Sequence, residues 1–307
     1  MTIDADRPAR AAPAPEPRRR TLAIAAADGP AELAAIEFGD PARPLDVIFL
    51  HANGFNALTY RQALAPLADR LHILAIDQQG HGRSAQRTAV ETRRNWLDLR
   101  DDLVALLDAL GGPPVVLSGH SMGGAASMLA AAERPDRVKA LALFDPVIMA
   151  RTLAGELGRG ERPAVIDSPL AAGARRRRAH FPSRAAAVDS YRGRGAFKTW
   201  PEAALVDYVA DGFRDRPDGS VELACAPEWE ASNFSAHGHD PWPALARITM
   251  PVVVLRAEHG STCQLTSRKP FPPENPDVRV ETVPGTTHFL PIERPDLVRE
   301  TLLQLAG

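Results

Sequence analysis

One stretch of the sequence, residues 115–136, restricts the possible folds more than any other. It reads VVLSGHSMGGAASMLAAAERPD: a run of β-branched and aliphatic residues, a serine between glycines, and an alanine-rich segment typical of a helix. The pattern predicts a strand, a sharp turn and a helix, and residues 119–123 match the G-x-S-x-G nucleophile elbow. Gly119 and Gly123 leave room for the strained turn that would hold the Ser121 hydroxyl above the end of the strand. We therefore expect Ser121 to be a nucleophile at a sheet edge.

The segments around this stretch alternate between strand and helix patterns. The segment from Trp96 to Leu110 carries an apolar stripe of leucines and predicts a helix. Two further segments, 57–70 and 294–306, also predict helices. Apolar runs predict strands at 22–27, 32–38, 46–51, 71–77, 115–119, 138–146, 250–258 and 278–283. This alternation predicts an α/β fold with a doubly wound, mostly parallel sheet and right-handed crossovers.

The alternation stops after residue 146. From 147 to 244 the sequence shows helix patterns, the clearest at Ser183–Tyr191 and Pro201–Phe213, but no convincing buried strand. We expect this segment to be a helical lid inserted into a core made of residues 21–146 and 245–307. The four arginines at 175–178 are expected to form a solvated helix face. Residues 1–20, rich in Pro, Ala and Arg, are expected to be a disordered tail.

Composition argues against several classes of function. The net charge of −2, with acidic and basic residues intermixed, carries no signature of nucleic-acid or membrane binding. No apolar run approaches the roughly 18 residues that span a bilayer, and the N-terminus lacks the apolar region of a secretory signal. The two cysteines, Cys225 and Cys263, imply no disulfide framework. We expect a cytoplasmic protein with a small-molecule substrate; its oligomeric state is not specified.

A serine nucleophile requires a base, and histidine is the side chain with a suitable pKa. His288 lies in the loop between the last predicted strand and the final helix, which places it at the same sheet edge as Ser121. We expect His288 to be that base. The sequence has no Cys/His cluster with zinc spacing, no G-x-G-x-x-G after a strand and no P-loop. The expected chemistry therefore uses no metal and no cofactor.

Several further motifs resemble those of α/β-hydrolase-fold enzymes, and the resemblance extends across roughly residues 21–307. HANGF follows the third predicted strand, DQQGHGRS begins at Asp77, and GHSMGG contains the nucleophile. MPVVVLRAEHG and GTTHFLPIERP complete the set in the C-terminal part. The resemblance implies the α/β-hydrolase fold with a helical lid, and an activity similar to that of serine esterases and lipases.

The acid of the expected catalytic triad is harder to assign. In most relatives it is an aspartate a few residues past the penultimate strand, but here that stretch reads AEHG at 257–260. Asp145 ends the strand that follows the elbow helix, where some members of the superfamily carry the acid. Glu258 lies nearer the usual position. We favour Asp145 because it ends a strand on the catalytic edge, and we keep Glu258 as the second candidate.

The resemblance also suggests an oxyanion hole and a pocket. Met122 would supply one N–H, and the HANG loop would supply the other, with Asn53 as first choice and Gly54 as second. The histidines at 51, 81 and 120 are expected to have structural roles. Aromatic residues of the inserted segment could line the substrate pocket, namely Phe197, Trp200, Tyr208, Phe213 and Trp229.

The leading hypothesis is a serine hydrolase that cleaves a carboxylic ester, thioester or lactone through an acyl-enzyme on Ser121. Relatives with this set of motifs also include carbon–carbon bond hydrolases and perhydrolases. An acyltransferase on the same triad and a non-catalytic ligand-binding protein on the same scaffold are two further hypotheses. The natural substrate does not follow from these motifs, because specificity depends on the lid and the pocket rather than on the fold.

Overall fold

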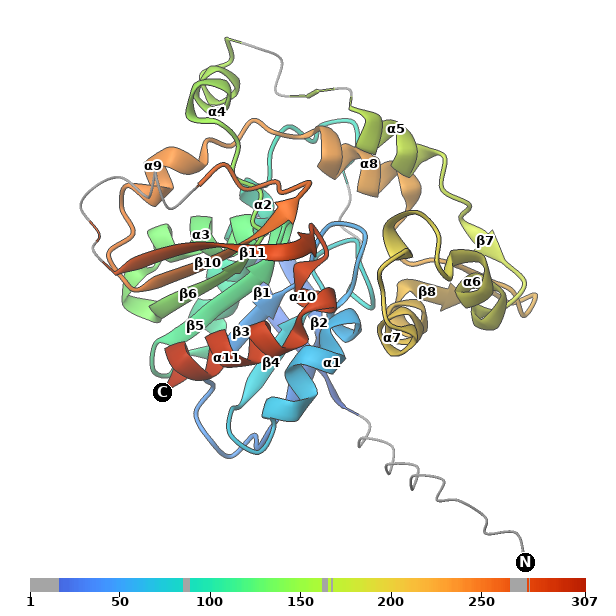
Figure 1. Ribbon diagram of the computed structural model, residues 1–307, viewed down its shortest axis with the longest axis horizontal. Helices are drawn as coiled ribbons and strands as arrows, with labels where there is room; N and C mark the ends of the chain where they lie inside the picture. Colours follow the sequence, from blue (N-terminus) through green and yellow to red (C-terminus); the bar gives the residue numbers. More distant parts are fainter. Residues whose placement is uncertain (1–16, 85–88, 162–164, 167, 266–274, 276) are drawn as a thin grey trace, which may run out of the picture.

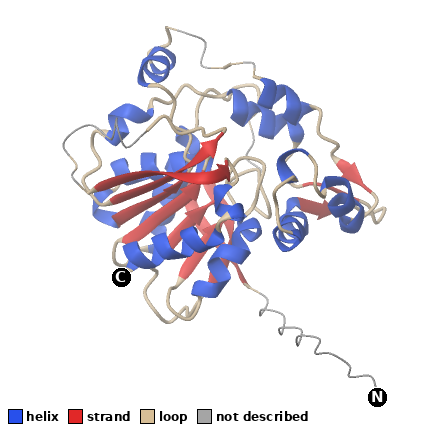
Figure 2. Ribbon diagram, viewed as in Figure 1, coloured by secondary structure: helices blue, strands red, loops and turns tan. Residues whose placement is uncertain are grey.

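The core of the protein is an eight-stranded sheet with helices packed on both faces (Figures 1 and 2). The computed structural model describes residues 17–84, 89–161, 165–166, 168–265, 275 and 277–307. The strands follow the order β1-β2-β4-β3-β5-β6-β10-β11 across the sheet. Their bounds are β1 Arg18–Ala26, β2 Gly29–Phe38, β3 Val47–Leu50, β4 Ile73–Ile76, β5 Val115–His120, β6 Val138–Phe144, β10 Val252–His259 and β11 Val278–Thr287.

Strand directions confirm the expected mostly parallel sheet. Strand β2 runs antiparallel to its neighbours β1 and β4, whereas the pairs from β4 to β11 are all parallel. Strand β3 lies beside β5, and β6 lies between β5 and β10. The carboxyl ends of β3, β5, β6, β10 and β11 therefore meet along one edge, which is where an open α/β sheet places its ligands.

Alternate side chains of the central strands pack on opposite faces of the sheet. Leu117 and Leu141 contribute to one apolar layer together with the helices α2 Leu97–Leu110 and α3 Met122–Glu133. Val116 and Ala142 contribute to the second layer, against α1 Arg61–Leu64 and α11 Pro295–Ala306. Because both faces are covered, the central strands are apolar throughout, as expected for parallel strands buried on both sides.

Two local expectations differ from the structure. The helix expected at 57–70 is divided into η1 Ala57–Tyr60, α1 Arg61–Leu64 and η2 Ala65–Leu67, because Pro66 cannot donate the hydrogen bond that a continuous helix needs. The tail expected at 1–20 ends earlier than predicted, since β1 begins at Arg18. Arg19 pairs with Asp211 at 2.6 Å and Arg20 with Glu37 at 2.9 Å, so these arginines are anchored; residues 1–16 lie outside the described residues.

The insertion, residues 147–244, lies beside and above the carboxyl edge of the sheet (Figure 1). Its predicted helices are present, with Ser183 capping α6 and Pro201 preceding α7. It also contains a three-stranded sheet of β7, β9 and β8, whose two- and three-residue strands are too short to give a strand pattern. The bounds are α4 Arg151–Gly158, α5 Pro169–Arg175, β7 His180–Phe181, α6 Arg184–Tyr191, η4 Gly195–Phe197, α7 Glu202–Gly212, β8 Phe213–Asp215, β9 Val221–Leu223, α8 Pro227–Ser235 and α9 Pro241–Leu245. The remaining elements are η3 Pro135–Arg137 and α10 Leu290–Glu293.

The arginine run at 175–178 is only partly the solvated face that we expected. Arg175, Arg176 and Arg178 are exposed, but Arg177 turns inward. Its guanidinium forms an ion pair with Glu230 and donates to the Tyr208 hydroxyl at 2.6 Å. Charge counting could not reveal this, because the partner carboxylate lies more than fifty residues away along the chain.

In the described part of the chain, no helix is long and apolar enough to cross a bilayer.

Candidate active site

Ser121 occupies the turn between β5 and α3, as the elbow motif predicts. Its backbone angles are φ 55° and ψ −118°, a combination that non-glycine residues rarely adopt. Asp145, just past the end of β6, has φ 41°, and these two are the only non-glycine residues with positive φ in the described part of the chain. Strained backbone concentrates at functional sites, where the surrounding structure holds it in place. Both residues are candidate members of the triad.

The elbow glycines are required by close backbone approach. A Cβ at position 123 would lie 2.5 Å from the Leu50 carbonyl oxygen and 2.6 Å from that of His51, and neither backbone can move away easily. We predict that Gly123→Ala destabilises the protein by about 1–3 kcal/mol, the usual cost of overpacking. Urea unfolding of the variant measures this. Gly173→Ala is the matched control, because no atom lies within 4 Å of its Cβ position; equal stability of the two variants would contradict the account.

The structure brings Ser121, His288 and Asp145 together. His288 lies at the start of the turn between β11 and α10, with Nε2 3.0 Å from Ser121 Oγ. Its Nδ1 lies 2.6 Å from Asp145 Oδ2. The histidine is thus placed to accept the serine proton on one nitrogen while the other donates to a carboxylate, which is the arrangement of a serine–histidine–acid triad.

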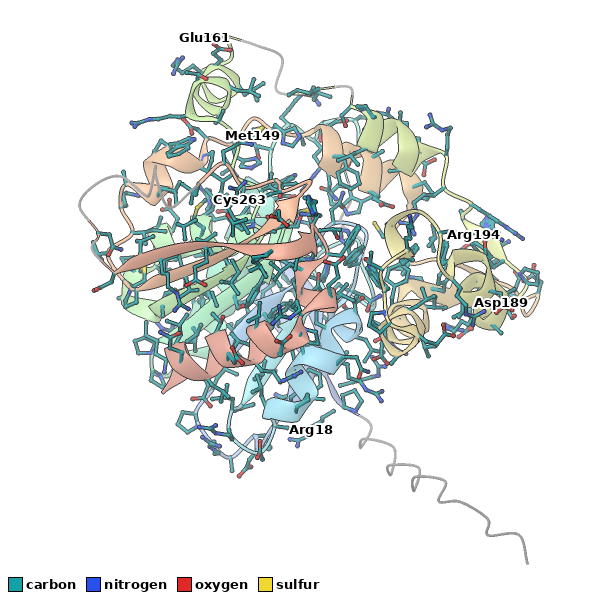
Figure 3. The ribbon with its side chains drawn as sticks, viewed as in Figure 1. Arg18, Met149, Glu161, Asp189, Arg194 and Cys263 are labelled. Atoms are coloured by element: carbon teal, nitrogen blue, oxygen red, sulfur yellow. The ribbon has the colours of Figure 1, made fainter. Side chains whose placement is uncertain are left out.

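The loop after β10 supports Asp145 instead of supplying the acid itself. Asp145 Oδ1 accepts hydrogen bonds from Ala257 N at 2.9 Å and Ser261 Oγ at 2.5 Å, and Oδ2 accepts one from Thr262 N at 3.1 Å. An isolated parallel β-bridge between the backbones of Ile148 and Cys263 holds this loop against the segment that follows β6 (Cys263 is labelled in Figure 3). At 257–262, the stretch in which the family resemblance places the acid, this chain carries hydrogen-bond donors to the carboxylate of Asp145.

Glu258, the second candidate for the acid, has different partners. Its Oε2 accepts a hydrogen bond from Gly285 N at 2.8 Å and lies 3.4 Å from the exposed ring of His259. Its side chain is 46% exposed, whereas Asp145 is fully buried. Burial alone would raise the pKa of Asp145, but the hydrogen bond and charge of His288, together with donation from Ser261 and Ala257, outweigh burial and hold that pKa below its ordinary value. The carboxylate beside His288 is therefore ionised.

The backbone N–H groups of Asn53 and Gly54, the two candidate oxyanion donors of this loop, differ in whether they already have a partner. Ala52 N donates to the Tyr60 hydroxyl at 3.1 Å, Gly54 N to His81 Nε2 at 3.0 Å, and Phe55 N to Ala52 O at 3.1 Å. Within the described residues, the Asn53 N–H has no acceptor. Met122 is the first residue of α3, so its N–H has no intrahelical acceptor either. The geometry favours Asn53 over Gly54 as the partner of Met122.

Three buried histidines link the loops around Ser121, as the structural roles expected for them suggest. His51 contacts Ala52 O at 2.7 Å and accepts from Gln78 N at 2.9 Å. His120 Nε2 contacts His288 O at 2.7 Å, and its Nδ1 lies 2.7 Å from the Tyr60 hydroxyl. A carbonyl oxygen only accepts, so His51 donates through Nδ1 and His120 through Nε2. The Gln78 N–H donates to His51 Nε2, which therefore carries no proton. Burial lowers the pKa of His120 to about 3, so its Nδ1 carries no proton either and accepts from the Tyr60 hydroxyl. These rings are therefore neutral in the folded protein.

Stability should fall when the pH drops below the ordinary histidine pKa. Burial lowers the pKa of His51 to about 4 and that of His239 to about 3, and burial together with the His288 charge lowers that of His120. Because the unfolded chain then binds more protons, each such histidine lowers the free energy of unfolding by about 1.4 kcal/mol per pH unit below about pH 6.5. Burial raises the pKa of Asp77 to about 6, so this carboxyl group increases the free energy of unfolding as the pH falls below about 6. One such group offsets only part of the loss caused by the three histidines. Urea unfolding at pH 7.5, 6 and 5 should show a loss of several kcal/mol; constant stability across this range would contradict the neutral histidines.

The expected pocket aromatics separate into three groups. Trp200 and Tyr208 contact Phe55 of the HANGF loop, with ring centroids 5.1 and 5.8 Å apart, and Phe197 packs behind them. Phe213 instead packs against Phe181 inside the insertion. Trp229, expected in the pocket, is 1% exposed and donates to Gln79 O at 3.2 Å, with Arg93 stacked on its ring.

Sequence reasoning missed two aromatics that lie closer to the triad. Phe55 lies 6.1 Å from Phe289 between ring centroids, and Phe289 follows His288 in the chain. Both are partly exposed, and Trp200 contacts both rings. Phe55 follows Gly54 and Phe289 follows His288 in the motifs, and these positions could have indicated that both rings lie near the site.

Among the residues that the structure describes, no group of three or more His, Cys, Asp or Glu side chains is placed to hold a metal ion.

Comparison with known families identifies the fold that this site occupies. The model of the family described as "Alpha/beta hydrolase family" matches residues 47–301, which include β3, the elbow, Asp145 and His288. The chain belongs to the alpha/beta hydrolase family. The fold class expected from the sequence is confirmed, and so is the expectation of an enzyme of the hydrolase class.

Individual relatives of this alpha/beta hydrolase have several different names. A 2-(acetamidomethylene)succinate hydrolase of Mesorhizobium japonicum is 25% identical over 258 residues, 83% of this chain and 86% of that protein. A crystal structure of E-2-(acetamidomethylene)succinate hydrolase has a TM-score of 0.74 at 24% identity, covering 94% of this chain and 99% of that one. Lipase LipV of Mycobacterium tuberculosis is 37% identical over 129 residues, but these cover only 42% of this chain and 46% of the lipase.

Proposed function

We propose that this alpha/beta hydrolase cleaves carboxylic esters, including thioesters and lactones, through an acyl-enzyme on Ser121. The observation that carries the proposal is the hydrogen-bonded series Ser121 Oγ, His288 Nε2, His288 Nδ1 and Asp145 Oδ2, with separations of 3.0 Å and 2.6 Å between residues. An ionised, fully buried Asp145 supports it, because the acid must stabilise an imidazolium without taking its proton.

The reaction would proceed in two halves. Ser121 Oγ attacks the ester carbonyl carbon while His288 Nε2 takes the hydroxyl proton. The carbonyl oxygen becomes an oxyanion, which the N–H groups of Asn53 and Met122 would stabilise. Collapse breaks the bond to the alcohol oxygen, and His288 returns its proton to that leaving group. Water, deprotonated by His288, then attacks the acyl-enzyme and releases the carboxylic acid and free Ser121.

The surroundings of the triad favour an uncharged, apolar substrate group. Phe55, Phe289 and Trp200 form an aromatic cluster next to His288. Arg177 is a half-buried cation of the insertion, and its charge is balanced by Glu230, whose carboxylate lies against Gly54. An anionic substrate group would have to displace that internal partner.

A second candidate is hydrolysis of a small dicarboxylate of the succinate type. The observation that favours it is the similarity to the 2-(acetamidomethylene)succinate hydrolase of Mesorhizobium japonicum, which covers 86% of that protein's length. The balanced Arg177–Glu230 pair is the physical argument for ranking it second.

The insertion and the location complete the proposal. We infer that residues 147–244 act as a lid, because side chains of the loop after β3 are hydrogen-bonded to this segment. Asn53 Nδ2 donates to Glu230 O, Asn53 Oδ1 accepts from Asn233 Nδ2, and Asn56 Nδ2 donates to Tyr208 O. Residues 21–146 and 245–307 would form the catalytic core under it. The cysteines Cys225 and Cys263 are both free and buried, which supports a reducing, cytoplasmic location.

A substrate panel tests the proposal. Steady-state rates should be measured on p-nitrophenyl esters from acetate to decanoate, on a thioester, on a lactone and on 2-(acetamidomethylene)succinate, with Ser121→Ala as the matched control. We expect ester turnover in the wild type and its loss in the control. Faster turnover of the succinate derivative than of any ester would select the second candidate. Ester turnover that is the same in Ser121→Ala would contradict both.

A further inference from the structure

The side chain of Asn53 is held by the insertion rather than by its own loop. Its Nδ2 donates to Glu230 O at 2.9 Å, and its Oδ1 accepts from Asn233 Nδ2 at 3.1 Å. Both partners belong to helix α8, and Asn233 is fully buried. We propose that Asn233 is a positioning residue of the oxyanion hole, which acts by fixing the orientation of Asn53. The inference rests on the proposed function, because it assigns the oxyanion contact to the Asn53 N–H.

The assignment of these amide atoms follows from the carbonyl partner. A carbonyl oxygen accepts and never donates, so the atom of Asn53 that faces Glu230 O must be the nitrogen. The Oδ1 atom of Asn53 therefore faces Asn233, and only the amide nitrogen of Asn233 can donate to it. The opposite orientation of either amide would bring together two donors or two acceptors.

His81 cannot replace Asn233 as the donor. His81 Nε2 lies 3.3 Å from Asn53 Oδ1, but the same nitrogen accepts the Gly54 N–H at 3.0 Å, while Nδ1 contacts Gln79 O at 3.0 Å. The ring must donate through Nδ1 and accept through Nε2, so it offers no proton to Asn53. Burial, and then the nearby His51, lower the pKa of His81 well below its ordinary value and keep it in this form. Asn233 is thus the one side-chain donor to Asn53 Oδ1 within the described residues.

The Asn53 N–H has no acceptor among the described residues, and Tyr60 and His81 bind only the neighbouring N–H groups of Ala52 and Gly54. The contacts that Asn53 itself makes are those of its side chain with α8, and they contribute to the orientation of its N–H. A shift of a few tenths of an ångström at an oxyanion donor changes the stabilisation of the transition state more than the binding of the substrate. Loss of the Asn233 contact should therefore lower kcat rather than raise KM.

Helix α8 has other attachments to the core, so its docking does not depend on the Asn233 side chain. Trp96 Nε1 donates to Asn233 O at 3.1 Å, and Trp229 Nε1 donates to Gln79 O at 3.2 Å. The Asn233 Oδ1 atom is buried and has no partner among the described residues. Asn233→Leu keeps the branched shape and the number of heavy atoms of the side chain and removes this unsatisfied oxygen, so it should fold even where Asn233→Ala leaves a damaging cavity.

A double-mutant cycle tests the proposal. Asn233→Ala and Asn233→Leu should each lower kcat on a p-nitrophenyl ester roughly 10- to 100-fold, with KM within about threefold of the wild type. Asn53→Ala should have a similar effect, and Asn233→Leu should add no further loss in the Asn53→Ala background, because the contact is already gone. Ser232→Ala is the control, since among the described residues this neighbouring buried hydroxyl bonds only to Trp229 O, and kcat should not change.

The outcomes separate this inference from the proposed function. If Asn233→Leu lowers kcat equally in the wild-type and Asn53→Ala backgrounds, or raises KM alone, then Asn233 does not act through Asn53 and the inference is overturned. Labelling of each variant with a fluorophosphonate serves as the second measurement. A wild type that is folded but not labelled at Ser121 would instead overturn the proposed function.

Discussion

Asp145→Asn should lower kcat by about 10⁴-fold on a p-nitrophenyl ester, with KM within about threefold of the wild type. Asparagine has the same shape and tolerates the positive φ of this position, so the fold should remain intact. An amide nitrogen facing His288 Nδ1 would, however, force the ring to carry its proton on Nε2, where it cannot accept the Ser121 proton. The carboxylate charge that stabilises the imidazolium is lost as well. Steady-state kinetics and a melting curve on the same preparation measure both effects.

Glu258→Gln is the matched control for this prediction. It neutralises the other carboxylate that the sequence offered as the acid, but Glu258 bonds to Gly285 N and is half exposed. We expect kcat within about twofold of the wild type, because a glutamine oxygen can still accept that hydrogen bond. If Glu258→Gln loses most of the activity while Asp145→Asn keeps it, the assignment of the acid is wrong.

His288→Ala should lower kcat by about 10⁵-fold or more, since it removes both the base for Ser121 and the partner of Asp145. The fold should not depend on this ring, because the contact with His120 Nε2 uses the main-chain oxygen of His288. The loss should appear in acylation and be measurable as the rate of p-nitrophenol release in a single turnover.

His180→Ala serves as the control for the histidine prediction. The exposed side chain of His180 lies on β7, an edge strand of the small sheet in the insertion. The His180→Ala variant should therefore be as active as the wild type. Retention of more than about a tenth of the wild-type rate in His288→Ala would mean that another group activates Ser121.

The turn at Ser121 and the position of His288 beside it could be predicted from the sequence because both follow from local patterns. A β-branched run, G-x-S-x-G and a helical segment define the turn at Ser121 without reference to any other part of the chain. His288 lies between the last strand and the final helix, and that position alone puts it on the same sheet edge. Parallel strands share an edge for their carboxyl ends, so the inference needs no contact information.

The sequence alone could not predict which carboxylate lies beside His288, because that depends on the order of the strands. Asp145 and Glu258 both lie at the carboxyl ends of strands, and the sequence does not state which strands are neighbours. In the structure β6 pairs with β10, which brings the loop at 260–263 against Asp145 and turns Ser261 and Thr262 into its donors. The residues that follow Gly260 therefore donate to the carboxylate of Asp145.

The interior of the insertion was the least predictable part. Hydrophobicity indicates that Trp229, Phe213 and Trp200 are buried, but not what each one packs against. Trp200 contacts the aromatic residues beside His288, Phe213 packs within the insertion, and Trp229 packs between Arg93 and the turn at Gln79. Contacts of this kind join residues far apart in the chain, and no local period encodes them.

Labelling with a fluorophosphonate tests the central claim most directly, because the reagent reacts only with a serine whose proton can be removed and whose oxyanion is stabilised. Intact-protein mass and a peptide map should be recorded for the wild type, Ser121→Ala and Asp145→Asn. We expect one adduct per wild-type chain, located on Ser121, no adduct on Ser121→Ala, and much slower labelling of Asp145→Asn. Folded wild-type protein that remains unlabelled, or that is labelled at another residue, would contradict the account.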